Sequence, residues 1–167
     1  SYSRAFRWFS NWTLTQTETP DDIRQAVGTG RSYSSFDFLG VPEGFDFFIV
    51  ADGELLELGQ EVDSVDSATV YIRTPVLSGA PWSEDRGLDF STAKLSTRLI
   101  RATAQGYTIE AQIPGQGTYL VRDVPATGAY RLETTITPVH TKPALAGLED
   151  LAEREYPYLY SNAIFLR

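Results

Sequence analysis

The sequence predicts an all-β domain: an antiparallel β-sandwich, immunoglobulin-like in general form, with one or two short helices. Two observations lead to this fold class. First, apolar and polar residues alternate with the two-residue period of a half-buried strand, most regularly over residues 107–113 and 130–136. Second, 13 glycines and 9 prolines divide the 167 residues into short segments at close spacing. Short strands separated by such turns are typical of antiparallel sandwiches.

The composition argues against several classes of function. The chain is 42% hydrophobic, as expected of a folded domain, and its net charge is −8. That charge disfavours sequence-independent nucleic-acid binding and docking on an anionic membrane, since both need clustered lysine and arginine. The absence of cysteine excludes disulfides and thiolate metal sites. No apolar run approaches the roughly 20 residues of a membrane helix, so we expect no membrane insertion.

Two domain-level expectations concern the ends of the chain. The sequence starts at Ser1 and contains no methionine, from which we expect a processed protein or, preferably, a fragment of a longer one. Residues 1–18 are expected to form a connecting arm from an upstream domain, and residues 19–167 to form the sandwich. No targeting segment is recognisable. The compartment therefore stays open between the bacterial cytoplasm and periplasm, and the oligomeric state stays open as well.

The arm is rich in aromatic residues. Phe6, Phe9 and Trp12 recur at near-helical spacing before an extended segment, which predicts a short helix and a strand that pack on the sheet. Two alternatives remain. Trp8 and Trp12 could form a face on which sugars stack, and the Asn-X-Thr triplet at Asn11 matches a glycosylation acceptor.

A short helix is predicted over Pro20–Gly28. Thr19 can cap it, the proline suits its first turn, and two aspartates follow near the positive helix N-terminus. Ile23, Ala26 and Val27 fall at i, i+3 and i+4, so we expect this face to pack on a sheet. Gly28 or Gly30 ends the helix, because glycine accepts a positive φ at low cost.

Strands are predicted where one face is apolar. Phe36 and Phe38 share one face of a strand, and Phe45, Phe47 and Ile49 share one face of the next. The hairpin dipeptide Asp52-Gly53 follows, and the other expected strands are residues 55–58, 68–74, 98–104, 107–113, 118–123, 130–136 and 156–166, the last interrupted at Ser161-Asn162.

Two further expectations concern the second half of the chain. Leucines at 145, 148 and 151 predict a second short helix near residues 144–154. The alternating positions of the strands predict the core, for which we name Phe47, Ile109, Ile113, Leu132 and Ile136.

We expect no catalytic, cofactor-binding or metal site. His140 is the only histidine, so a Ser-His-Asp triad or a multi-histidine metal site lacks partners. The adjacent carboxylates of Glu84-Asp85 and of Glu149-Asp150 point to different faces. The acidic segment 57–66 lacks the ligand spacing of a calcium loop, which favours a solvated loop. The glycines of Gly28-Thr29-Gly30 follow a helix, whereas phosphate-cradling loops precede one.

Short motifs occur at both ends of the chain. They are Ser1-Tyr2-Ser3-Arg4 through Asn11, Ala26-Val27-Gly28-Thr29-Gly30-Arg31-Ser32-Tyr33, Phe36-Asp37, Gly44-Phe45 and Tyr160-Ser161-Asn162-Ala163-Ile164. In these motifs the chain resembles the C-terminal portion of PHP-domain metal-dependent phosphoesterases, the polymerase and histidinol phosphatase superfamily. In that group the catalytic PHP domain comes first, as a distorted α/β barrel with a multinuclear metal site. In some members a β-sandwich follows, which a Gly-Arg-Ser/Thr-Tyr strand introduces and a Tyr-Ser-Asn-Pro-Ile strand closes.

The resemblance implies a function without catalysis. Ala163 stands where the family's closing motif has proline, and residues 55–139 share with the family only the general pattern of strands and turns. The family's metal-binding histidines have no counterpart in this chain. The chain would be a C-terminal accessory domain that packs on a PHP-type catalytic domain and stabilises it. The alternative is an independent ligand- or carbohydrate-binding module of a cell-envelope protein, which stacks sugars on Trp12 or Trp82. A small stand-alone enzyme with a carboxylate pair is the third possibility.

Overall fold

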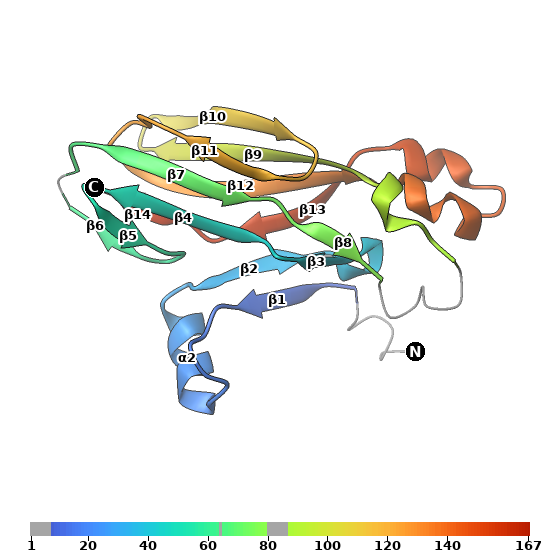
Figure 1. The fold of residues 1–167 in the computed structure, drawn as a ribbon, viewed down its shortest axis with the longest axis horizontal. Coiled ribbons are helices and arrows are strands. Elements are labelled where there is room, and N and C mark those ends of the chain that lie inside the picture. Colours follow the sequence, from blue (N-terminus) through green and yellow to red (C-terminus); the bar gives the residue numbers. More distant parts are fainter. Residues whose placement is uncertain (1–7, 64, 80–86) are drawn as a thin grey trace.

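The two longest strands, β9 (Lys94–Thr103) and β12 (Gly128–Thr137), pair antiparallel at the centre of the larger sheet (Figure 1). The computed structural model describes residues 8–63, 65–79 and 87–167. In this part of the chain the sheet runs β1-β2-β13-β12-β9-β10, with β14 also paired with β12, and β6 parallel to β14. Its other strands are β1 (Ser10–Thr13), β2 (Ser32–Ser35), β6 (Glu61–Val62), β10 (Gly106–Pro114), β13 (Tyr156–Ser161) and β14 (Ile164–Leu166).

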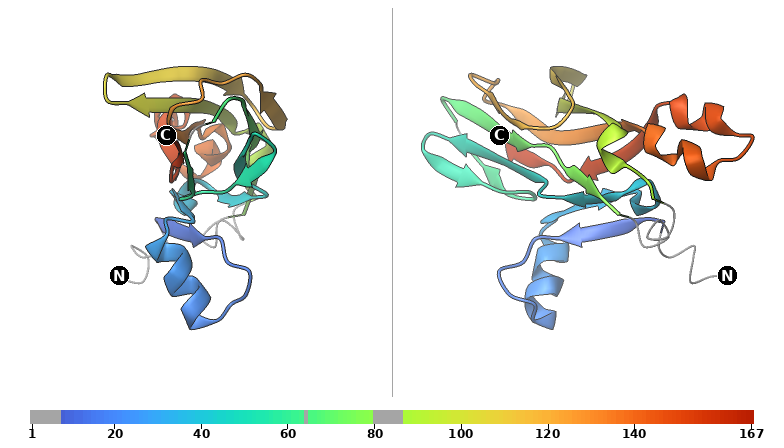
Figure 2. Two further views of the ribbon diagram at one scale, coloured as in Figure 1. Left: turned by 90° about the vertical axis from the view of Figure 1, so that its left-hand side faces the viewer. Right: turned by 45° about the vertical axis from the view of Figure 1, so that its right-hand side comes forward.

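A second sheet packs against the inner face of the first, as the view along the strands in Figure 2 shows. Its order is β11-β7-β4-β5, and its strand pairs are all antiparallel. Two further strands, β3 and β8, form a small antiparallel pair. The predicted antiparallel β-sandwich is therefore confirmed. The strands of this paragraph are β3 (Val41–Glu43), β4 (Asp46–Ala51), β5 (Glu54–Leu56), β7 (Ala68–Arg73), β8 (Val76–Ser78) and β11 (Thr118–Val121).

The core lies between the two sheets. Alternate residues of β4 and β7 face alternate residues of β9 and β12, and all of these side chains are buried. Thr97 and Thr134 lie among them, and their hydroxyls satisfy each other through a 2.9 Å hydrogen bond. Four of the five expected core residues are buried as predicted: Phe47, Ile113, Leu132 and Ile136.

Ile109 is the exception, because half of its side chain is exposed. Strand β10 contains a β-bulge: Ile109 pairs with Ile100 and Ala111 pairs with Leu99, which leaves Glu110 as an extra residue. One extra residue reverses the alternation of side chains, so the two halves of β10 present opposite faces to the core. The prediction that Ile109 belongs to the core is wrong for this reason.

Helix α2 (Pro20–Gly28) has the predicted bounds and caps. The Thr19 hydroxyl accepts a hydrogen bond from the backbone N–H of Asp22, at 3.3 Å. Gly30, with a φ of 75°, turns the chain out of the helix into β2. These features depend on neighbouring residues only, and the sequence therefore predicts them directly.

The packing of α2 differs from the prediction. Ala26 is buried, but Ile23 and Val27 are 43% and 61% exposed. The helix stands clear of both sheets in Figures 1 and 2. The apolar spacing identifies an amphipathic helix without saying which surface its apolar face meets. The prediction that this face packs on the chain's own sheet is wrong.

Two other elements differ from prediction. Phe36 and Phe38 do not lie on a strand, because β2 ends at Ser35 and the chain then makes a 3₁₀ turn over Asp37–Leu39. The α-helix expected near residues 144–154 is replaced by 3₁₀ segments, Val139–Ala144 and Glu149–Glu153. Between them Gly147 adopts a φ of 81°, which interrupts the helical path.

Three segments that are distant in sequence meet at one point, which we call the clasp and define as Thr29, Gly30, Gly59 and Asn162. The Asn162 amide donates to the Gly30 carbonyl at 2.9 Å. At Gly59 a Cβ atom would lie 1.9 Å from the Thr29 carbonyl oxygen, so only glycine fits. The Gly-Arg-Ser-Tyr and Tyr-Ser-Asn motifs thus lie side by side, in the paired strands β2 and β13 and in the clasp.

Candidate docking surface

Large aromatic side chains gather where the described chain begins. Trp8 and Phe9 are 58% and 45% exposed. Each also contacts another ring, since Trp8 lies 5.7 Å from Phe38 and Phe9 lies 5.2 Å from Phe36, between ring centroids. These separations are within the range of favourable aromatic pairs. The rings are therefore held in position while much of their surface faces solvent.

Hydrogen bonds from the core fix the backbone beneath these rings. The buried Ser35 hydroxyl donates to the buried Asp37 carboxylate at the start of the 3₁₀ turn. At its end the Tyr158 hydroxyl donates to the Gly40 carbonyl at 2.8 Å. Burial raises the pKa of Tyr158, so this hydroxyl keeps its proton at ordinary pH. The aromatic residues at 36 and 38 thus sit on a turn that the core holds rigidly.

Part of the expected connecting arm is fixed to the sandwich. Within residues 1–18, strand β1 pairs with β2 and forms one edge of the larger sheet. The helix expected from Phe6, Phe9 and Trp12 falls partly on residues 1–7, which lie outside the described residues. At Trp12 the expectation is wrong, because that residue lies on strand β1. Trp8 and Phe9 come directly before β1, so the sheet edge holds them close to the body of the molecule.

An apolar pocket of about 370 Å³ continues from Phe38. Its other walls come from the 3₁₀ segments that follow β12 and from the start of β13. The polar groups on these walls are already bonded: the Thr141 hydroxyl donates to the Pro138 carbonyl, and the Tyr156 hydroxyl donates to the Leu151 carbonyl. The pocket can therefore receive an apolar side chain but offers it no directional group.

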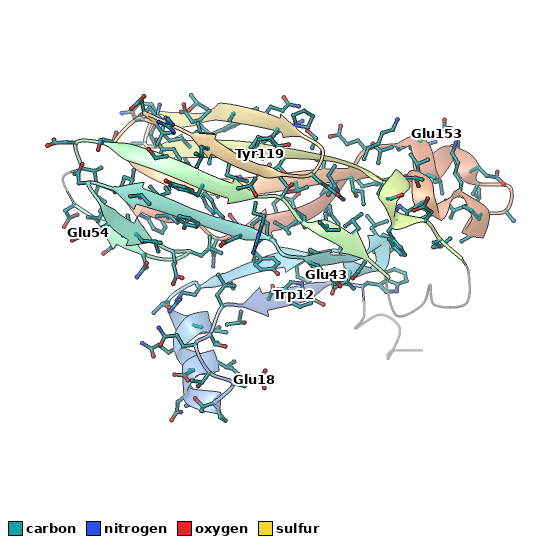
Figure 3. All side chains as sticks on the ribbon, in the orientation of Figure 1. Trp12, Glu18, Glu43, Glu54, Tyr119 and Glu153 are labelled. Atoms are coloured by element: carbon teal, nitrogen blue, oxygen red, sulfur yellow. The ribbon has the colours of Figure 1, made fainter. Side chains whose placement is uncertain are left out.

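Trp8 and Phe9 precede β1, and helix α2, which follows β1, carries two more exposed apolar side chains, Ile23 and Val27. The helix lies on the same side of the sandwich as β1, below both sheets in Figures 1 and 2, and Figure 3 shows its side chains standing clear of the sheets. We define the docking surface as Trp8, Phe9, Phe38, Ile23 and Val27. The sequence predicted a connecting arm that includes Trp8 and Phe9, but it placed Phe38 on a strand. It also assigned Ile23 and Val27 to packing on the sheet. Their i, i+4 spacing indicates that the helix has an apolar face, but not whether the partner of that face belongs to this chain.

Comparison with known proteins adds no family assignment. No family model, curated protein or solved structure matches the chain. Among the described residues, no helix is long and apolar enough to cross a membrane.

The tryptophans proposed as a sugar platform have different surroundings. Trp12 is half-buried, stacks on Tyr33 at a centroid distance of 6.1 Å and an angle of 11°, and donates to the Ser35 hydroxyl at 2.8 Å. It packs against the core, so its ring is not a free platform. Trp82 lies outside the described residues, as do Glu84 and Asp85.

The remaining candidate residues do not converge. His140 is 3% exposed, and its ring lies 4.7 Å from that of Phe90. Burial lowers the pKa of His140, an effect that the backbone of Leu39 partly offsets, so the native ring is neutral near pH 7. Glu149 and Asp150 are exposed. In the part of the chain that the structure describes, no three His, Cys, Asp or Glu side chains come together as metal ligands.

Proposed function

We propose that the chain is a non-catalytic accessory domain that packs on a neighbouring catalytic domain through the docking surface. Helix α2 is the observation that carries this proposal. It has nine residues, stands clear of the sheets and exposes Ile23 and Val27. Helices shorter than about 12–15 residues are marginal in water and gain most of their stability from packing an apolar face. A partner that covers these two side chains would supply that packing.

The partner that we infer is a PHP-type phosphoesterase domain in the same polypeptide. The motifs at both ends of the chain support this choice. The position of Trp8 and Phe9 supports it as well, because both directly follow the segment that would connect the two domains. A domain joined there would meet the docking surface without a long linker, and exposed apolar patches of this kind mark interfaces.

The chain itself would contribute binding energy and no chemistry. Its one histidine is buried, and among the described residues no three His, Cys, Asp or Glu side chains come together. We therefore expect the purified chain to hydrolyse no aryl phosphate and to carry no stoichiometric zinc, manganese or iron. Metal at one equivalent, or turnover that survives removal of contaminating phosphatases, would overturn this part of the proposal.

The test begins with the natural reading frame that contains the chain. A histidine-rich PHP segment before Ser1 would support the proposal, and a signal peptide directly before Ser1 would refute it. The double variant Ile23→Ser/Val27→Ser is then made in the full-length protein. We expect it to lower the thermal unfolding midpoint and the phosphoesterase activity, because the domains separate when the apolar contact is lost.

The matched control is Val76→Ser/Leu120→Ser. These two side chains are 54% and 48% exposed, but they lie on strands β8 and β11, outside the docking surface. The control should leave both the midpoint and the activity of the full-length protein unchanged. In the isolated chain, neither double variant should alter stability by more than about 0.5 kcal/mol. Equal effects of the two variants in the full-length protein would contradict the proposal.

A further inference from the structure

A row of polar side chains crosses the outer face of the larger sheet, on the side away from the core. Its members occupy directly paired positions on six neighbouring strands, so they lie in line although they come from distant parts of the sequence. From β1 to β10 they are Asn11, Ser34, Tyr160, Glu133, Arg98 and Gln112. A hollow of about 300 Å³ lies beside the β1, β2 and β13 members of the row.

A second hollow, of about 280 Å³, lies at the other end of the row. Ile100 is buried within it, while Tyr107 and Ile109 are 74% and 50% exposed on its wall. The β-bulge at Glu110 creates this wall, because it turns the first half of β10 outward. Without the bulge Ile109 would lie in the core and the hollow would lose its apolar side. The bulge thus supplies an apolar wall on an otherwise polar face, and bulges recur at such sites.

The charges in this hollow do not balance. Arg131 forms an ion pair with Glu133 at 2.6 Å. Arg98 is the direct cross-strand neighbour of Glu133, yet its side chain makes no hydrogen bond or ion pair with a described residue. Its Nε–H is shut off from solvent without an acceptor. Two arginines and one glutamate leave one positive charge in the hollow, in a chain whose net charge is −8.

A buried donor without an acceptor costs free energy, so a native protein that keeps one calls for an explanation. A ligand in the hollow meets the terminal nitrogens of Arg98 rather than Nε, and an anion there would neutralise the charge of the guanidinium. Arginine pairs best with planar oxyanions such as carboxylates, which it can hold through two parallel hydrogen bonds. The exposed ring of Tyr107 beside it would contact the flat apolar side of a cyclic ligand.

We propose that this outer face binds an oligosaccharide that contains a uronic acid, with the sugar carboxylate on Arg98 and the sugar ring against Tyr107. The hollow is near the lower end of the volume range of small-molecule sites, as suits one sugar ring. The amide and hydroxyl groups along the row, and the second hollow beside Tyr160, continue the site for neighbouring sugars. An extended acidic peptide is the less favoured ligand, since strand addition binds through the backbone of an edge strand, whereas the groups of this site are side chains on the outer face of the sheet.

The test measures binding of trigalacturonate, and of a glucuronate trisaccharide, by calorimetry at low salt. We expect at least one of them to bind, and its methyl ester, which lacks the charge, to bind at least tenfold more weakly. Tyr107→Ala should weaken binding as well; its side chain is 74% exposed, so the fold does not depend on it. Arg122→Met, an exposed arginine outside the row, is the matched control and should bind like the original chain.

Arg98→Met separates a binding role from a structural one. A binding role predicts at least a tenfold loss of affinity together with a thermal midpoint that is unchanged or higher, because the variant removes an unsatisfied donor. A structural role predicts a lower midpoint. The proposal is overturned if neither uronate binds, if Arg98→Met binds as well as the original chain, or if pentaglutamate binds as tightly as the uronates, which would indicate unspecific attraction of anions.

Discussion

Gly59 is the position in the clasp where a single added methyl group meets backbone. Its φ is 79°, and a Cβ there would overlap the Thr29 carbonyl oxygen. A left-handed conformation alone costs alanine about 1–2 kcal/mol. Relief of the overlap must also separate β2 from the loop before β6. We therefore expect Gly59→Ala to lower the free energy of unfolding by about 3 kcal/mol, as measured by urea denaturation.

Gly53 provides the control for this substitution. It lies in the hairpin turn between β4 and β5 with a φ of 90°, and an added Cβ would have nothing within 4 Å. Gly53→Ala thus reports the conformational cost without the overlap, and we expect it to lose about 1–2 kcal/mol. If both variants lost the same free energy of unfolding, the clasp would accommodate the added methyl group without strain. That result would contradict our interpretation.

His140 makes the stability of the protein depend on pH. Burial against Phe90 lowers its pKa, so the native state holds the neutral ring, while the unfolded chain titrates near pH 6.5. Below pH 6.5 the unfolded state binds a proton that the native state rejects. The stability due to the neutral ring is therefore complete above about pH 6.5. It is lost as the pH falls from there toward the lowered folded-state pKa.

We expect a shift from pH 7 to pH 5 to lower the free energy of unfolding of the original chain through this residue. His140→Leu should remove most of that dependence, as urea denaturation at several pH values would measure. Carboxylates titrate lower: the backbone N–H groups of Asp66 and Ser67 lower the pKa of Asp52, for example, so its effect belongs to more acidic pH. Parallel pH curves for the variant and the original chain would contradict a buried neutral histidine.

At the scale of the elements, β4 shows how one strand divides its residues between core and surface. Phe47 is 2% exposed, whereas Phe48 on the opposite face stacks on Tyr71 of β7, with centroids 4.6 Å apart. We expect Phe47→Ala to cost about 3–5 kcal/mol in the free energy of unfolding, and Phe48→Ala to cost about 1 kcal/mol. A loss below about 1 kcal/mol at Phe47 would mean that the two faces are exchanged.

The sequence predicted the strands of the central core because the alternation of apolar and polar residues along each strand indicates which face is buried. In β12, Leu132 and Ile136 alternate with polar residues, and both are buried. The hairpin after β4 was predictable for a local reason. Asp52 and Gly53 adopt φ values of 48° and 90°, which this dipeptide accepts readily. The bounds of α2 followed from its caps in the same way.

The wrong predictions concern features that a local pattern does not contain. The bulge at Glu110 depends on how β10 meets β9, and it reversed the side on which Ile109 lies. The helix expected near residues 144–154 had suitable leucines, but Gly147 turns the chain with a positive φ. Whether the apolar face of α2 is buried depends on which other strands and helices already cover the sheet, and the spacing within the helix does not contain this information.

The candidate docking surface was predictable in part. Trp8 and Phe9 stood out as an aromatic arm from composition alone. Ile23 and Val27 did not, because an amphipathic helix with an internal partner and one with an external partner have the same spacing. The outer-face hollow was not predictable, since Arg98, Tyr107 and Glu133 become neighbours only through the register of β9 with β10 and β12.

In the described part of the chain, a sandwich with its own hydrophobic core carries one α-helix outside it. The two sheets bury their apolar faces against each other without α2, in which Ala26 is buried but Ile23 and Val27 face solvent. A short helix with few internal contacts opens easily, so its amides exchange fast with solvent. A partner domain on the docking surface would suppress the opening of this helix and leave the opening of the core strands unchanged.

Hydrogen exchange of the α2 amides is thus the most direct test of whether the chain is an accessory domain that binds its partner through the docking surface. The amides of residues 23–28 are compared in the isolated chain and in the natural full-length protein. We expect their protection to rise at least tenfold in the full-length protein, while that of the central strand β12 changes little. Equal protection of α2 in the two proteins would contradict the docking surface and, with it, the proposed function.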